Sequence, residues 1–195
     1  MKKIILASGS PRRRELLTQI GISFEVVKAE GEEKITTDDP EEAVKELAMQ
    51  KVQEVAGRVD ADVVIGADTV VAVDGEIMGK PKDPEDALRM IHRIQGRDHE
   101  VLTGVAVILK KGEVETTINF AETTRVHVFP MTEEEIQAYV ASKEPMDKAG
   151  AYGIQGLFAA YVSGIEGDYN NVVGLPVGRL YQEVKAIADV DLRTL

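Results

Sequence analysis

The sequence contains no cysteine and no long hydrophobic run. The absence of cysteine excludes disulfide bonds, thiolate metal sites and a cysteine nucleophile, and it leaves the redox compartment open. No apolar stretch is long enough to span a bilayer. The first residues, Met1-Lys2-Lys3 followed by four apolar residues, are too short a pattern for a signal peptide. We therefore expect a cytoplasmic protein with no membrane partner.

Basic residues are few, because 23 Lys and Arg stand against 34 Asp and Glu, giving a formal net charge of -11. A nucleic-acid backbone requires a basic footprint, so this balance argues against nucleic acid as a partner. A small phosphorylated ligand is still compatible, since charges beyond about 8 Å are screened at physiological salt. The length suits a single domain over residues 1–195, or two closely packed lobes, and a homodimer is the generic expectation.

The chain also lacks the phosphate-binding signatures G-x-x-x-x-G-K-[ST] and G-x-G-x-x-G. Residues 4–7 nevertheless predict a strand that passes through Ser8-Gly9-Ser10 into a helix, with Pro11 at its first position and arginines at 12–14. Ser10 is suited to cap this helix. Free backbone N–H groups, the helix dipole and the arginines together favour a bound anion, and phosphate fits them best. The alternative is a solvated basic turn.

Strand and helix patterns then alternate irregularly, with hairpin signals among the crossovers. This mixture predicts an α/β fold with a mixed sheet instead of a purely parallel one. Helices are expected after the caps at Asp39-Pro40, Asp83-Pro84 and Thr132, and from Pro176 onward. Strands are expected at 24–27, 63–73, 101–109, 114–128 and 157–162, with hairpins at Asp74-Gly75, Lys110-Lys111-Gly112 and around Gly167.

Two charged residues interrupt apolar patterns. Asp68 lies within the run 63–73, where a buried carboxylate is costly unless it is paired, bound to a metal or facing a cleft. It is either a general base or metal ligand, or a turn aspartate at a strand break near Gly66. Lys51 interrupts the apolar stripe of the helix after Pro40, where it either extends past the core edge or points into a cleft.

Other candidates say less by themselves. Lys80, which the following proline holds in an extended conformation, and the pair Glu32-Glu33 in an acidic loop would ordinarily be solvated. The glycine-rich stretch 147–156 allows close approach of the backbone to a flat ligand, and Gln155 offers both a donor and an acceptor. This combination suits the edge of a nucleobase, although a tight loop without a ligand is equally compatible with the composition.

Several of these segments occur in order between residue 4 and about residue 180. They are Leu6–Arg13, Gly66–Val70, Gly79-Lys80-Pro81, Glu144–Gly156 and Val173–Pro176. Together they resemble the Maf family of nucleotide pyrophosphatases. The resemblance implies a mixed, strongly twisted sheet flanked by helices in two lobes around a cleft, as in the inosine-triphosphate pyrophosphatases. It also implies hydrolysis of nucleoside triphosphates to the monophosphate and pyrophosphate, with Mg²⁺ or Mn²⁺ as cofactor.

The resemblance also implies roles for particular residues. Arg12-Arg13, Thr69 and the ending Gly153–Gly156 look like the branch acting on dTTP and UTP, and not like the branch acting on 7-methyl-GTP. Asp68 would accept a proton from water, with Lys51, Lys80 and Glu32 as further catalytic residues. The residues expected to bind substrate are Ser8, Arg12, Arg13, Thr69 and Gln155, of which Arg12, Thr69 and Gln155 match positions associated with substrate choice.

The residues themselves fit this chemistry. Attack of water on the α-phosphorus places charge on the departing pyrophosphate, which arginines and lysines stabilise. Asp68 and Glu32 would repel the phosphates unless a divalent cation lay between them, so both are predicted metal ligands. A rival hypothesis is a nucleotide-binding regulator of cell division without turnover. A regulator of that kind would need the basic residues but no acid that activates water.

Overall fold

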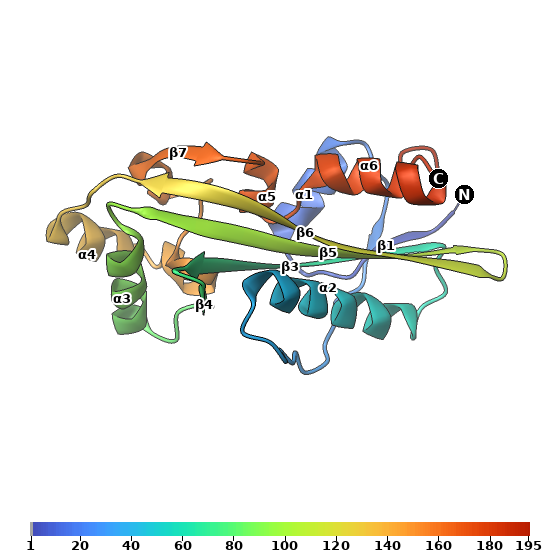
Figure 1. The fold of residues 1–195 in the computed structure, drawn as a ribbon, viewed down its shortest axis with the longest axis horizontal. Helices are drawn as coiled ribbons and strands as arrows, with labels where there is room; N and C mark the ends of the chain where they lie inside the picture. Colours follow the sequence, from blue (N-terminus) through green and yellow to red (C-terminus); the bar gives the residue numbers. More distant parts are fainter. Residues whose placement is uncertain (1) are drawn as a thin grey trace.

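The structure, a computed structural model, describes residues 2–195 as an α/β fold built on one seven-stranded sheet (Figure 1). The strands are β1 (Ile4–Leu6), β2 (Glu25–Val26), β3 (Val63–Val73), β4 (Glu76–Met78), β5 (Asp98–Lys111), β6 (Val114–Val128) and β7 (Val162–Glu166). Their order is β2-β1-β3-β5-β6-β7, and β4 pairs with β3 off this path. β1 runs parallel to β2 and β3, whereas β3 to β7 pair antiparallel, so the predicted mixed sheet is confirmed.

Helices pack on both faces of the sheet (Figure 1). They are α1 (Pro11–Gln19), α2 (Pro40–Ala56), α3 (Pro84–Ile94), α4 (Glu133–Ala141), α5 (Tyr169–Val173) and α6 (Val177–Ala188), with 3₁₀ turns at Glu144–Asp147, Ala149–Ala151 and Leu157–Tyr161. Because successive strand residues point to opposite faces, Val64 of β3 joins the core under α2, whereas Val63 and Ile65 join the main core under the other helices.

The helix starts predicted from the sequence are confirmed. Ser10, Asp39, Asp83 and Thr132 each accept, through a side-chain oxygen, a backbone N–H of the first helical turn. The capping box at Thr132 is complete, because the Glu135 side chain accepts the Thr132 N–H in return. These contacts satisfy donors that a helix start leaves without intrahelical partners.

Two predictions near the C-terminal end are wrong. The residues 157–161 form a 3₁₀ turn in which Phe158 is buried and Leu157 is exposed, and the strand begins only at Val162. An apolar run without alternation does not distinguish a strand from a turn of helix. The expected hairpin around Gly167 is instead the entry to α5, whose cap Asp168 accepts the Asn170 N–H at 2.8 Å.

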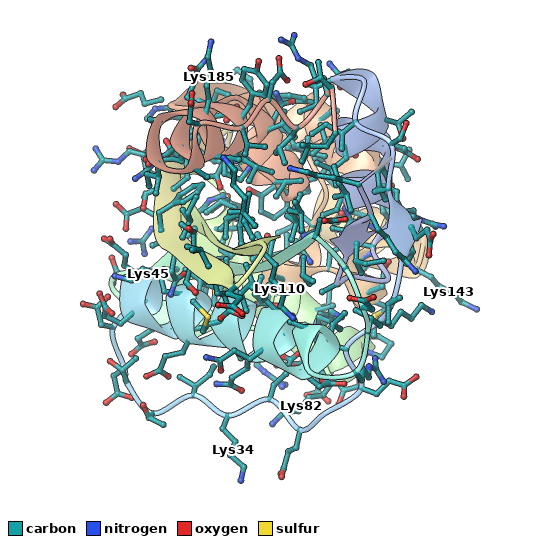
Figure 2. All side chains as sticks on the ribbon, turned by 90° about the vertical axis from the view of Figure 1, so that its right-hand side faces the viewer. Lys34, Lys45, Lys82, Lys110, Lys143 and Lys185 are labelled. Atoms are coloured by element: carbon teal, nitrogen blue, oxygen red, sulfur yellow. The ribbon has the colours of Figure 1, made fainter. Side chains whose placement is uncertain are left out.

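Charged side chains extend outward from this core, among them Lys34, Lys82 and Lys143 (Figure 2). Within residues 2–195, no helix is both long and apolar enough to cross a bilayer.

Candidate active site

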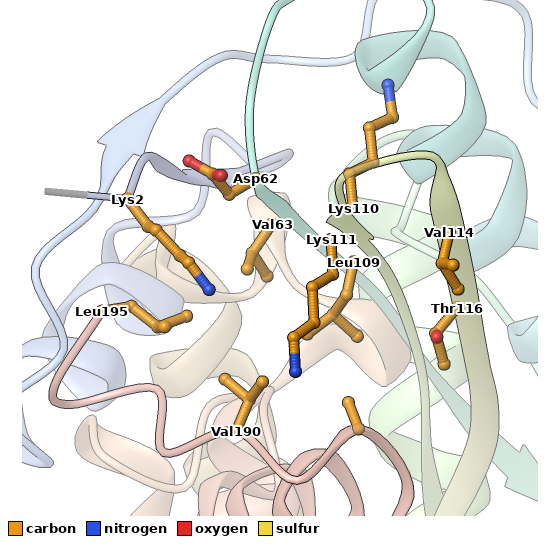
Figure 3. Close-up of a pocket in the computed structure, with 11 residues that line it drawn as sticks. Lys2, Asp62, Val63, Leu109, Lys110, Lys111, Val114, Thr116, Val190 and Leu195 are labelled. Atoms are coloured by element: carbon orange, nitrogen blue, oxygen red, sulfur yellow. The ribbon is translucent and has the colours of Figure 1, made fainter.

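A cleft of about 970 Å³ opens beside the middle of β3. It is lined by the loop between β1 and α1, by α2, by the residues after β4, by the glycine-rich stretch 144–156 and by the end of α5. This volume is within the range of pockets that bind small molecules. A second hollow, between Lys2, Leu109 and Leu195, measures only about 70 Å³ and is too small for a nucleotide (Figure 3).

The edge of β3 explains why a carboxylate occurs within an apolar strand. On this edge β3 pairs with β1 through residues 63–65 and with β4 through residues 71–73. Between these two pairings no strand of the described residues 2–195 pairs with this edge of β3, and Asp68 and Thr69 lie in the gap. Both residues line the cleft and are partly exposed, whereas the strand residues before and after them are buried. The gap therefore gives Asp68 access to a ligand without breaking the strand.

Close packing of α2 on the sheet places Lys51 beside Asp68. A Cβ atom on Gly66 would come within 2.4 Å of the Val52 side chain, and one on Gly104 would come within 2.0 Å of the Val44 carbonyl oxygen. Gly66 is thus a site of helix contact, and the alternative of a strand break there is wrong. The Lys51 ammonium group, on the face of α2 toward the cleft, contacts the Asp68 carboxylate directly.

The Lys51 ammonium group also lies 3.0 Å from the Glu33 carboxylate, and Glu33 lines the cleft. The predicted acid, Glu32, does not line it: its side chain is 84% exposed and its carboxylate lies 4.0 Å from the Lys34 ammonium group. In an extended loop, adjacent side chains point in opposite directions, so a shift of one residue exchanges cleft for solvent. The structure therefore brings the second glutamate of the pair to the cleft.

The arginine-rich turn divides its three side chains. Arg12 and Arg13 line the cleft, whereas Arg14 is exposed outside the lining. The Arg13 guanidinium donates from Nε to the Gly174 carbonyl oxygen at 2.8 Å and from its terminal nitrogens to Ser8 Oγ at 3.2 Å and Thr69 Oγ1 at 3.0 Å. Burial lowers the pKa of Arg13, and the nearby Asp68 carboxylate acts in the opposite direction. Arg13 thus links three distant segments beside the cleft.

The stretch 144–156 forms another wall. The Glu144 carboxylate accepts the Leu157 N–H at 2.9 Å, which holds the two ends of the stretch together. Gly150 has a φ of 67° and its Cβ position lies 2.7 Å from Val71, so a larger residue would fit poorly there. Gln155 is exposed in the lining, where its amide is accessible to a ligand, and Lys80 lines the cleft after β4.

The structure thus brings the predicted site residues, apart from Glu32, to one cleft. These are Ser8, Arg12, Arg13, Lys51, Asp68, Thr69, Lys80 and Gln155. Their catalytic and binding roles stay predictions.

Sequence reasoning missed His99, which is buried on β5 with its Nε2 atom 2.6 Å from the hydroxyl of Tyr152 in the cleft wall. Alternation along β5 contained the signal, because position 99 is in phase with the buried Val101.

The donor atoms of the cleft suit a hard divalent cation only in part. Asp68 and Glu33 both approach the Lys51 ammonium group, so two carboxylates converge on one point. Within the described residues 2–195, no group of three or more His, Cys, Asp or Glu side chains is arranged to hold a metal ion. Magnesium commonly binds through one or two carboxylates together with substrate phosphates. The pair therefore fits a cation that arrives with a phosphorylated ligand.

Comparison with known proteins is consistent across the chain. Residues 3–187 match a family described as "Maf-like protein". The "dTTP/UTP pyrophosphatase" of Agathobacter rectalis is 52% identical over 201 residues, covering 96% of this chain and 98% of that protein. The protein of the same description from Lachnoclostridium phytofermentans is 51% identical over 188 residues, covering 95% of each. Among solved structures, the Staphylococcus aureus Ham1 protein gives a TM-score of 0.48 at 16% identity, covering 65% of this chain and 72% of that one.

Proposed function

This chain belongs to the Maf family, and from that premise we propose that it is a nucleoside triphosphate pyrophosphatase that hydrolyses dTTP and UTP. The products are the nucleoside monophosphate and pyrophosphate. Relatives described as dTTP/UTP pyrophosphatases are about half identical to it over nearly their full length, which supports the enzyme over a regulator without turnover.

One observation carries the proposal: an acid that can take a proton from water lies in the same cleft as the residues that can hold a polyphosphate. Asp68 is on the open edge of β3, and the Ser8 hydroxyl and the side chains of Arg12 and Arg13 line the same cleft, with Arg13 bonded to the adjacent Thr69. Water then attacks the α-phosphorus, the bond to the β-phosphate oxygen breaks, and the water proton passes to the Asp68 carboxylate. The cationic side chains stabilise the charge on the departing pyrophosphate.

The Asp68 and Glu33 carboxylates would hold Mg²⁺ or Mn²⁺ together with the substrate phosphates. Bound there, the cation would neutralise phosphate charge and polarise the phosphoryl oxygens. Lys51, which pairs with both carboxylates in the structure and offsets one of their two charges, keeps them close together beside the cleft. With substrate in the cleft, the Lys51 ammonium group would donate to a phosphate oxygen.

The test is pyrophosphate release from dTTP, UTP, CTP and GTP with Mg²⁺. We expect Asp68→Asn to lower kcat about a hundredfold or more, because proton transfer by a positioned side chain contributes roughly 10²–10⁴ in rate. The matched control is Asp74→Asn, in the exposed turn directly after the same strand, with an expected change of less than about twofold. Undiminished turnover by Asp68→Asn would remove the base assignment. No turnover of any triphosphate by the unmodified protein would favour the regulator.

A further inference from the structure

A chain of hydrogen bonds runs from Arg13 through the hydroxyl groups of Thr69 and Thr103 to Asn171. Thr69 of β3 and Thr103 of β5 are directly opposed in the antiparallel register, and their hydroxyl oxygens are 2.9 Å apart. Thr103 is fully buried, and its hydroxyl donates to the backbone carbonyl of Asn171 in α5 at 3.1 Å. Thr69, by contrast, is partly exposed in the cleft. Thr103 is therefore outside the cleft lining, and its hydrogen bond to Thr69 connects it to the cleft.

The positions of the hydroxyl protons follow from the partners. A backbone carbonyl can only accept, so the single proton of Thr103 is committed to Asn171. In the pair of hydroxyls Thr69 must then be the donor, and its own single proton points to Thr103. The Thr69 oxygen also accepts from the Arg13 guanidinium at 3.0 Å, which occupies one of its two lone pairs. What Thr69 has left for a ligand in the cleft is one lone pair and no proton.

We propose that Thr103 is a positioning residue that fixes Thr69 as a hydrogen-bond acceptor, so that the cleft selects a nucleoside group that donates a hydrogen bond. Such a donor is either the imide N–H of uracil or thymine or a sugar hydroxyl. Cytosine presents an acceptor where uracil presents its imide N–H, so an acceptor-only Thr69 facing it would leave two lone pairs opposed. The inference rests on the proposed function for the substrate class and extends it to the origin of specificity.

The test compares three variants. Thr103→Val removes the acceptor of the Thr69 proton while keeping the shape of the strand residue, and Thr103→Ser retains the hydroxyl. Thr124→Val is the control for loosening of α5: Thr124 is also buried, accepts from Asn171 at 3.0 Å and exchanges hydrogen bonds with Asp168, but it is not bonded to Thr69. For UTP we expect kcat/KM to fall about tenfold in Thr103→Val and to stay within about twofold in Thr103→Ser, and any fall in Thr124→Val should be equal for all substrates.

Comparison of three substrates identifies which group of the nucleotide donates a hydrogen bond to Thr69. A loss by Thr103→Val with UTP but not with CTP identifies the imide N–H. A loss with UTP and CTP but not with 3′-deoxy-UTP identifies the sugar hydroxyl. An equal loss with all three substrates, or losses no larger than those of the Thr124→Val control, would overturn the proposal. A double variant with Thr69→Val should lose no more than Thr69→Val alone, and multiplicative losses would also overturn it.

The same ratios are measured as Kd values for non-hydrolysable α,β-methylene analogues of UTP and CTP by calorimetry. These binding ratios separate the two proposals. A protein that binds the analogues with the expected preference but never releases pyrophosphate would contradict the enzyme and support the role of Thr103. A protein that hydrolyses UTP but loses no more in Thr103→Val than in the Thr124→Val control would do the reverse.

Discussion

Gln155, predicted to take part in substrate choice, carries an amide and is exposed in the cleft lining. We expect Gln155→Glu to reduce the preference for uracil and thymine over guanine about tenfold, because an N–H donor is replaced by an acceptor that repels the base carbonyls. Values of kcat/KM for UTP, dTTP and GTP measure this preference. Gln19→Glu, which adds the same charge on α1 outside the lining, should leave it unchanged. An unaltered preference in Gln155→Glu would contradict the assignment.

The buried His99, which is paired with Tyr152 of the cleft wall, makes the stability of the fold depend on pH. Burial lowers the pKa of His99 to about 4, and its Nε2 atom is paired with the Tyr152 hydroxyl. The unfolded chain, with a histidine pKa near 6.5, binds a proton below that value while the folded protein does not until about 4. Stability from neutral His99 is therefore complete above about pH 6.5 and is lost progressively as the pH falls toward 4.

The corresponding experiment measures the free energy of unfolding in urea at pH 7 and pH 5. From His99 alone we expect a loss of about 2 kcal/mol between these values. His99→Gln retains a partner for Tyr152 but has no titrating group, so the difference between the two proteins isolates the histidine. The other histidine with a resolved shift, His127, has its pKa raised by a hydrogen bond to Asp98 and acts with the opposite sign in both proteins. Parallel pH curves for the two proteins would contradict the prediction.

At single positions the sequence predicts which residue can act in the site better than it predicts where the side chain of that residue points. Asp68 was identifiable because a carboxylate in an apolar strand needs a partner or a cleft, and the structure supplies both. Glu32 and Glu33 are equivalent in composition, and the path of an irregular loop alone decides which of them faces Lys51. The acceptor state of Thr69 depends on Thr103 and Asn171, which are 34 and 68 residues away from their respective partners. Local patterns do not contain that information.

The packing of α2 on the central strands determines the geometry between Lys51 and Asp68. Gly104 is the closest point, because a Cβ atom there would lie 2.0 Å from the backbone oxygen of Val44. We expect Gly104→Ala to destabilise the protein by about 3 kcal/mol and to lower kcat, since the helix backbone itself must move. Urea unfolding and pyrophosphate release measure the two effects.

Gly178→Ala provides the comparison, because nothing lies within 4 Å of the Cβ position in α6. Its expected effect is a stabilisation of up to about 1 kcal/mol, from the higher helix propensity of alanine. A Gly104→Ala protein that unfolds at the same urea concentration as the unmodified protein would show that α2 does not pack as closely as described.

Elements with strong local signals were predictable, and those without were not. The start of α2 carries a cap, a proline and first-turn acids, and the whole helix was anticipated as far as Gly57. The 3₁₀ turn at Leu157–Tyr161 carries none of these signals, and its apolar residues are typical of a strand. The five-residue α5 is too short to form alone and is held by tertiary contacts of the buried Asn171. Contacts formed only in the folded chain therefore account for both errors.

At the scale of the whole molecule, the cleft differs in charge from the rest of the surface. The protein has a formal charge of -11, yet the lining holds equal numbers of both signs: the cations are Arg12, Arg13, Lys51, Lys80 and Lys148, and the acids are Glu15, Glu33, Asp68, Glu144 and Asp147. A formally neutral cleft avoids the repulsion that the remaining surface exerts on a triphosphate. It does not by itself neutralise the several charges of that ligand, which is the physical reason to expect a cation to bind with it.

Because the cleft is built from segments far apart in the sequence, its ligand should stabilise the entire fold. At a hundred times its Kd, a non-hydrolysable UTP analogue with Mg²⁺ contributes about 2.7 kcal/mol, or roughly 5–10 °C in Tm for a chain of this size. We expect EDTA to remove more than half of this rise. Glu33→Gln should likewise lose the metal-dependent part, whereas Glu32→Gln, the same charge change one residue away, should keep it. An equal rise with and without Mg²⁺ would mean that the side-chain cations alone hold the phosphates, and Asp68 and Glu33 would then need another role.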